Sequence, residues 1–128
     1  MKNQRTVKIL SLKNQAWIAD GCDVAESFFD RLKGLMGRRA LTRGQGLWFP
    51  RCNCIHMWGM RIPLDILFIR KEKGRAGEEI WRVISFQSNV RPWTLFPTYD
   101  FLATDTLELP VGTLQRCALQ EGDSLCIS

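Results

Sequence analysis

The stretch Leu64–Arg70 constrains the fold more than any other part of the chain. Apart from Asp65 and the terminal arginine, its residues are apolar, so both faces of a strand built from it are hydrophobic. Such a pattern predicts a central strand that is buried on both sides. Asp65 would then be a buried carboxylate, which is costly unless it is paired or hydrogen-bonded. We expect it to form a structural ion pair with an arginine.

Short apolar segments separated by turn residues make up most of the remaining chain. The expected strands are Thr6–Leu12, Ala16–Asp20, Gly46–Phe49, Cys52–Met57, Ile80–Gln87, Phe101–Leu109 and Ser124–Ile127. One helix is expected near residues 24–33, capped by Asp23, and a helical turn is expected near residues 111–117. Strands that follow one another without intervening helices favour a mainly β fold: one compact antiparallel β-sandwich or open barrel.

Length and cysteine content indicate one domain in a reducing compartment. The 128 residues are enough for a single domain over 1–128 with an ordinary hydrophobic core. The five cysteines are an odd number without a CxxC pair, and no secretory signal is visible. No apolar run approaches the ~18 residues of a membrane helix. We therefore expect a cytoplasmic protein with free thiols and no membrane partner.

Positive charge is concentrated in one segment. Residues 31–64 contain seven basic and no acidic residues, whereas the rest of the chain carries a net charge of −2, which gives +5 overall. This segment could be a solvated arginine surface. It could also form a patch for an anion such as phosphate, carboxylate or nucleic acid.

Residues able to do chemistry gather at the end of this basic segment. The only histidine, His56, is followed by Trp58, Met60 and Arg61. If the glycine-bracketed bend at residues 34–39 packs against them, Arg38 joins His56 and Arg61 around one pocket. Arginine matches carboxylate and phosphate bidentately, so we predict a small anionic ligand, with Trp58 and Met60 as the pocket walls.

Two acidic residues are expected to position the groups that line this pocket without contacting the ligand. Asp65 and Glu108 lie in apolar strands and would hold arginines or backbone in place. This hypothesis requires no cofactor.

Six stretches of the chain, in order, resemble the domain of unknown function 192 family. They are residues 31–38, Gly46–Phe49, Ile55–Phe68, Arg91–Trp93, Leu107–Gly112 and Gly122–Asp123. The resemblance implies a compact β-sandwich-like domain with few helices. It implies no activity, since no role is established for the family. Cys52 and Cys54 lie outside the family's motif.

Other readings of the same residues remain open. His56 and Asp65 could serve an enzyme, with or without a metal ion. Cys52, Cys54 and His56 alternate along a strand and could ligate zinc, but a second ligand pair is missing, so no metal site is predicted. A basic segment interleaved with tryptophans could bind single-stranded nucleic acid or an acidic protein; nucleic acid is the less favoured partner. The oligomeric state does not follow from the sequence.

Overall fold

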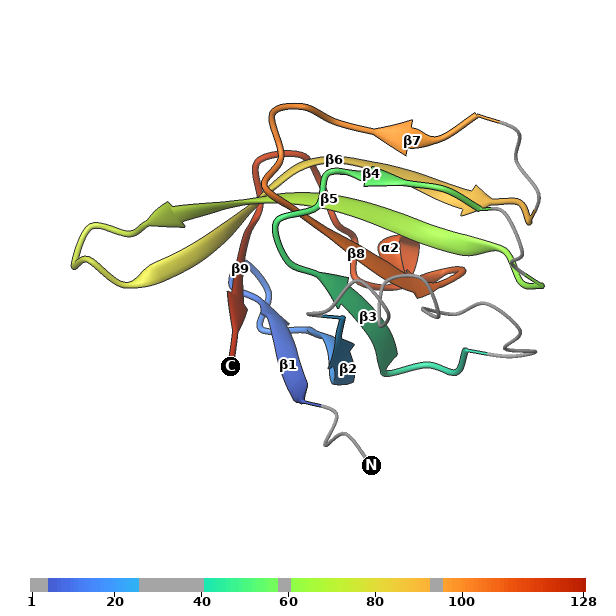
Figure 1. The fold of residues 1–128 in the computed structure, drawn as a ribbon. Coiled ribbons are helices and arrows are strands. Elements are labelled where there is room, and N and C mark those ends of the chain that lie inside the picture. Colours follow the sequence, from blue (N-terminus) through green and yellow to red (C-terminus); the bar gives the residue numbers. More distant parts are fainter. Residues whose placement is uncertain (1–4, 26–40, 58–60, 93–95) are drawn as a thin grey trace.

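Seven strands close into a β-barrel, as Figure 1 shows for the computed structural model, which describes residues 5–25, 41–57, 61–92 and 96–128. The barrel strands are β1 (Thr6–Ser11), β2 (Trp17–Val24), β3 (Gln45–Phe49), β5 (Leu64–Lys73), β6 (Glu79–Val90), β8 (Asp105–Pro110) and β9 (Ser124–Ile127). Around the barrel they follow the order β1-β2-β3-β8-β5-β6-β9, and β9 pairs again with β1. Two short strands, β4 (Cys54–Ile55) and β7 (Thr98–Tyr99), pair with each other, and α2 (Thr113–Arg116) is a single helical turn.

The structure confirms the mainly β fold and the helical turn near residues 111–117. It also refines the architecture. The barrel is closed rather than open, because β9 bridges β6 and β1. The pairing is mixed, because β2 and β3 are parallel while the other described pairs are antiparallel. A parallel pair needs a long crossover connection, and residues 25–44 supply it.

The first residue of the helix expected near residues 24–33 belongs to a strand, as does its expected cap. Val24 is the last residue of β2, and Asp23, its expected cap, pairs with Thr6 in β1 and Leu47 in β3. Because Asp23 belongs to a strand with neighbours on both sides, its backbone does not begin a helix. Most of the predicted helix lies outside the described residues.

The barrel interior contains one of two hydrophobic cores. All seven barrel strands contribute to it, and its members include Ile9, Ile18, Trp48, Leu67, Trp81, Leu107 and Leu125. Trp48 and Trp81 meet edge to face, with ring centroids 5.3 Å apart. Edge-to-face contact is a favoured geometry for aromatic pairs.

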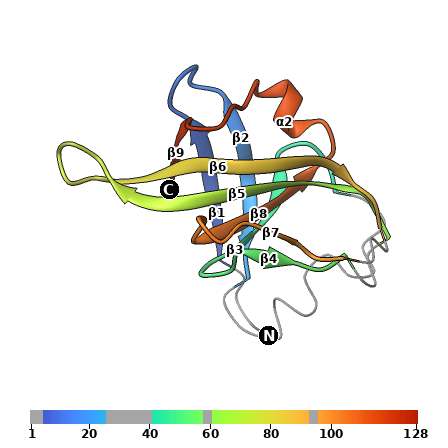
Figure 2. The same cartoon turned by 90° about the horizontal axis from the view of Figure 1, so that it is seen from above.

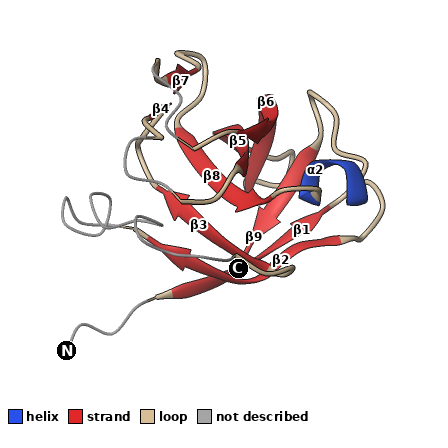
Figure 3. Ribbon diagram, turned by 90° about the vertical axis from the view of Figure 1, so that its right-hand side faces the viewer, coloured by secondary structure: helices blue, strands red, loops and turns tan. Residues whose placement is uncertain are grey.

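The second core lies on the outer face of β3, β5 and β6. Leu64, Ile66 and Phe68 of β5 pack there with residues of β4 and with Ala103. The β4–β7 pair runs alongside the barrel (Figures 1 and 3). This outer layer explains why β5 is apolar on both faces: one face points into the barrel and the other into the second core.

Two predicted strands are shorter than expected. Of Cys52–Met57, only the two residues of β4 are in a strand. The strand expected over Phe101–Leu109 begins at Asp105, and Phe101 lies outside it with 77% of its surface exposed. Its ring lies against Tyr99, with centroids 4.7 Å apart. Conversely, β5 and β6 run past their predicted ends and form a long hairpin that projects from the barrel (Figures 1 and 2).

Candidate anion-binding site

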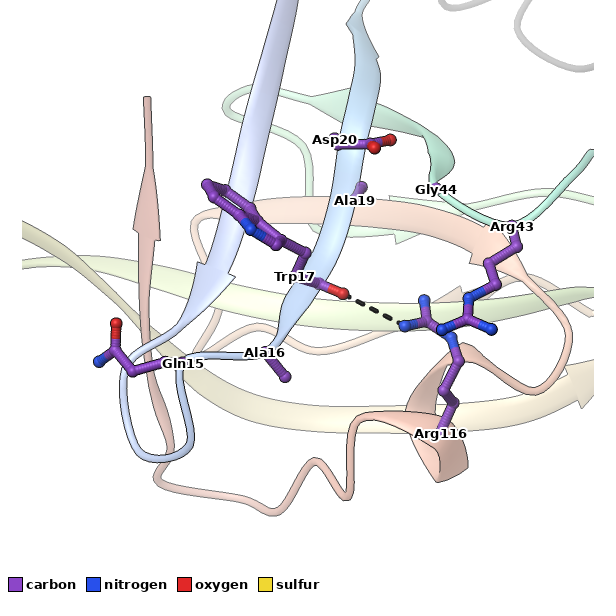
Figure 4. A pocket seen from close by; sticks show the side chains of 8 residues that line it. All are labelled: Gln15, Ala16, Trp17, Ala19, Asp20, Arg43, Gly44 and Arg116. Atoms are coloured by element: carbon purple, nitrogen blue, oxygen red, sulfur yellow. Dashed lines mark hydrogen bonds between the residues drawn. The ribbon is translucent and has the colours of Figure 1, made fainter.

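A pocket of about 640 Å³ lies between β2, the loop that precedes β3, and α2. Its polar side chains include Asp20, Arg43 and Arg116 (Figure 4). Residues 15–17, at the turn from β1 to β2, complete one wall. The pocket is therefore built from three segments that are distant in sequence.

Arg116, the last residue of α2, is held in place by the backbone of β2. Its Nη1 donates to the carbonyl of Trp17 at 3.2 Å, and its Nη2 donates to the carbonyl of Ile18 at 3.3 Å. These bonds occupy only part of the guanidinium, which has five N–H donors. Arg116 is thus oriented by the fold and still presents donors to the pocket.

Asp65 anchors the beginning of the same helical turn. Its Oδ2 accepts hydrogen bonds from the backbone N–H groups of Gly112 and Leu114, both at 3.1 Å. Its Oδ1 accepts from the N–H of Asn89 at 2.9 Å. A carboxylate from β5 therefore caps α2, whose own N-cap residue, Gly112, has no side chain to do so.

The expectation for Asp65 was correct about burial and wrong about the partner. The residue is only 1% exposed, and its partners in the described part of the chain are three backbone amides, not an arginine. The amide donors compensate for the desolvation of a buried carboxylate as an ion pair would. Asp65 therefore has a structural role at the start of α2.

Arg43 reaches the pocket because Gly44 approaches β2 closely. The carbonyl of Gly44 accepts from the N–H groups of Asp20 and Gly21, both at 3.0 Å. Gly44 has a φ of +91°, and a Cβ at this position would lie 2.6 Å from Oδ1 of Asp20. The positive φ favours glycine here. As a consequence, the side chains of Arg43 and Arg116 both line the pocket (Figure 4).

The electrostatics of the pocket favour an anion. Two arginines and one aspartate line it, which gives a formal charge of +1. Burial raises the pKa of the neighbouring Cys117 thiol, while the charges of Arg116 and Arg43 oppose that rise. Both guanidinium groups therefore act on the same small region. An oxyanion between them would relieve their mutual repulsion and accept charge-assisted hydrogen bonds.

Only two of the predicted ligand-binding residues can be placed. His56, after β4, and Arg61, before β5, are both exposed. Arg38, Trp58 and Met60 lie outside the described residues. The convergence of these five side chains therefore stays a prediction.

Glu108 is the second predicted supporting residue, and it is buried. It is 3% exposed, and its Oε2 has no hydrogen-bond partner among the residues that the structure describes. In the barrel register it lies between Leu47 of β3 and Ile66 of β5, on the face of β8 that meets the second core. Burial raises the pKa of its carboxyl from 4.5 to about 8. Glu108 is therefore protonated at neutral pH.

The cysteines show no grouping of metal ligands in the described ranges, where no three His, Cys, Asp or Glu residues are arranged to hold an ion. The thiol of Cys52 donates to the carbonyl of Cys54 at 3.3 Å. Burial raises the pKa of Cys54, and the neighbouring Cys52 adds to the rise. Burial also raises the pKa of Cys22 to about 12. These two thiols are neutral at physiological pH.

Comparison with known proteins agrees with the resemblance seen in the sequence. The model of DUF192, a family described as uncharacterized ACR, matches residues 10–127. The chain belongs to this family. The comparison with curated proteins returned no match.

Two crystal structures share the DUF192 fold of this chain. A protein of unknown function from Novosphingobium aromaticivorans matches with a TM-score of 0.76 and 23% identity, covering 96% of this chain and 84% of its own. A putative transcription regulator from Sinorhizobium meliloti matches with a TM-score of 0.72 and 22% identity, covering 97% of this chain and 93% of its own. At such identities these matches establish the fold alone.

Among the residues that the structure describes, no helix of this DUF192 protein is long and apolar enough to cross a membrane.

Three of the seven basic residues in the segment 31–64 lie within the described residues. Arg43 and Arg51 lie beyond opposite ends of β3, and Arg61 precedes β5. Arg43 and Arg51 therefore belong to two different pockets.

The sequence analysis did not single out Arg116, which is the better-positioned arginine of the pocket. It occurs near the end of a four-residue helical turn, where no periodic pattern marks it. In the sequence, Gly112 predicts that a helical turn begins after it. It does not predict the direction in which the side chain of the last residue, Arg116, points.

Proposed function

We propose that this DUF192 protein is a binding module for a small oxyanion, such as phosphate or a carboxylate, at the Arg43–Arg116 pocket. The observation that carries the proposal is that Arg43 and Arg116 line one pocket and that the charges of both act on the neighbouring Cys117 (Figure 4). Arg116 is already oriented by two backbone carbonyls, so little side-chain entropy is lost when an anion binds. Planar guanidinium groups also match the geometry of these anions.

Phosphate should bind to the wild-type protein, and the loss of either arginine should weaken this binding. We expect Arg116→Gln and Arg43→Gln each to raise the dissociation constant by about tenfold, the usual effect of losing a charged hydrogen bond. Isothermal titration calorimetry with inorganic phosphate measures this change. Arg75→Gln is the matched control, because Arg75 is exposed in the turn between β5 and β6.

The same titration distinguishes this pocket from the corner predicted around His56 and Arg61. If His56→Ala and Arg61→Gln leave phosphate affinity unchanged, the anion binds between Arg43 and Arg116. If these two variants lose affinity and the pocket variants retain it, the predicted corner is the binding site. Absence of binding to phosphate and simple carboxylates at low ionic strength would overturn the proposal.

The enzyme hypothesis gains less support from the described residues. Both oxygens of Asp65 accept backbone N–H groups, so its carboxyl group already has a structural role. A reaction that uses His56 would therefore need another acidic partner.

A further inference from the structure

The Arg43–Arg116 pocket also contains a carboxylate, to which the proposed oxyanion function gives no role. Asp20 of β2 is exposed and lines the pocket together with both arginines (Figure 4). A carboxylate beside a bound phosphate would repel it, because both groups are negative. Asp20 therefore either weakens the binding of every anion or contacts a positive group that the same ligand carries.

Backbone hydrogen bonds set the positions from which Asp20 and Arg43 extend. The carbonyl of Gly44, the residue after Arg43, accepts from the N–H groups of Asp20 and Gly21, both at 3.0 Å. The loop that precedes β3 is thus tied to β2 next to the carboxylate. The negative group and one positive group of the pocket consequently start from neighbouring positions on two adjoining segments.

The three charged side chains of the pocket do not neutralise one another. In the part of the chain that the structure describes, no ion pair joins Asp20, Arg43 or Arg116 to an opposite charge. The guanidinium of Arg116 donates to two backbone carbonyls, which carry no formal charge. All three side chains are also exposed. A ligand can therefore reach each of these charges without breaking an existing ion pair.

Small residues leave room between these charges. Ala16 and Ala19 line the pocket beside Gly44, and Ala19 is buried in β2, where it pairs with Ile9 of β1. The pocket volume of about 640 Å³ lies within the range of small-molecule sites. The pocket thus has space for a ligand with one charged group at each end.

We propose that the ligand of this pocket is a small phosphorylated amine, which carries a phosphate group and a primary ammonium group. This inference rests on the proposed oxyanion function. The phosphate lies against Arg43 and Arg116, and the ammonium donates to the carboxylate of Asp20. A phosphate monoester has a charge of about −2 at neutral pH, and one ammonium group reduces it to about −1. That charge complements the formal charge of +1 that the lining residues give the pocket.

Two compounds isolate the contribution of the ammonium group. O-Phosphoethanolamine carries this group, whereas propyl phosphate has a methyl group in its place. We expect the wild-type protein to bind phosphoethanolamine about fivefold more tightly in isothermal titration calorimetry, the effect of one good exposed ion pair. Glycine has an ammonium group but a carboxylate instead of a phosphate, so it should bind more weakly than phosphoethanolamine.

The Asp20→Asn variant tests whether the carboxylate makes this distinction. It is nearly isosteric and keeps both arginines. We expect it to bind phosphoethanolamine less tightly, because the ammonium loses its partner, and propyl phosphate more tightly, because repulsion of the phosphate is removed. A loss of structure would instead weaken the binding of both compounds. Glu121→Gln removes an exposed carboxylate outside the pocket and should keep the wild-type ratio of affinities.

The same titrations can overturn this inference separately from the proposed function. Equal wild-type affinities for phosphoethanolamine and propyl phosphate would refute the phosphorylated amine and leave the oxyanion function standing. A preference for phosphoethanolamine that Asp20→Asn retains would also refute it, since the ammonium would then bind elsewhere. Tighter binding of glycine than of phosphoethanolamine would exclude phosphate as the anionic group. If neither inorganic phosphate nor any of these compounds binds, the oxyanion function fails and this inference fails with it.

Discussion

Asparagine in place of Asp65 should lower the free energy of unfolding by about 3 kcal/mol, because a buried carboxylate that accepts several hydrogen bonds loses its charge and one acceptor atom. The side-chain amide nitrogen would face N–H donors that it cannot accept, either that of Asn89 or those of Gly112 and Leu114. Chemical denaturation at neutral pH measures the change. Such a loss would make Asp65 one of the main determinants of stability in this chain.

Glu121→Gln is the control for this substitution, since Glu121 is exposed in the turn before β9. Its effect should stay within about 0.5 kcal/mol, as is usual at surface positions. A loss below about 1 kcal/mol in Asp65→Asn would contradict the assignment of Asp65 as the anchor of α2. The folded fraction of Asp65→Asn should also bind phosphate more weakly, because α2 positions Arg116.

The sequence was most informative for β5, because a strand that is buried on both faces has an unusual run of apolar residues. Apolar residues on both faces of β5 predicted a central strand, and β5 indeed pairs with β6 and β8. The same reasoning showed that Asp65 had to be satisfied within the protein. Its partners could not be predicted, because the amides of Asn89, Gly112 and Leu114 belong to segments that lie beside Asp65 only through the pairing of β5 with β6 and β8.

The alternation of residues in β8 separates an apolar face, with Leu107 and Leu109 in the barrel interior, from a face that carries polar residues. Thr106 and Glu108 are buried there, because the β4–β7 layer and the second core cover that face of the barrel. A sequence pattern of period two distinguishes the faces of a strand, but it does not show whether another layer covers the polar one.

The candidate anion-binding site was predictable in chemical type but not in position. The excess of arginine in residues 31–64 suggested an anion, and Arg43 belongs to that segment. Its neighbour Arg116 lies 73 positions later and meets it only because α2 packs against the β1–β2 turn (Figure 3). Contacts between such distant segments depend on tertiary structure, which spacing along the chain does not encode.

Glu108 should make the stability of the protein fall as pH rises from about 5 to about 8. Its pKa is 4.5 in the unfolded chain and about 8 in the folded protein, so over this interval the folded state holds a proton that the unfolded state releases. Stability is fully present below the lower value and decreases by about 1 kcal/mol per pH unit until the folded carboxyl ionises. Urea denaturation across this pH range measures the slope.

Two substitutions separate the contribution of Glu108 from that of other titrating groups. Glu108→Gln is nearly isosteric and does not ionise, so its stability should exceed that of the wild type by a margin that grows up to about pH 8. Glu108→Leu also removes Oε2, which is buried without a partner among the described residues, and we expect it to be the more stable variant at every pH. If the pH slopes of wild type and Glu108→Gln were parallel, Glu108 would have to be ionised in the folded protein. If the two slopes differ as expected, Glu108 is uncharged in the folded protein and occupies a position where a hydrocarbon side chain would be more stable.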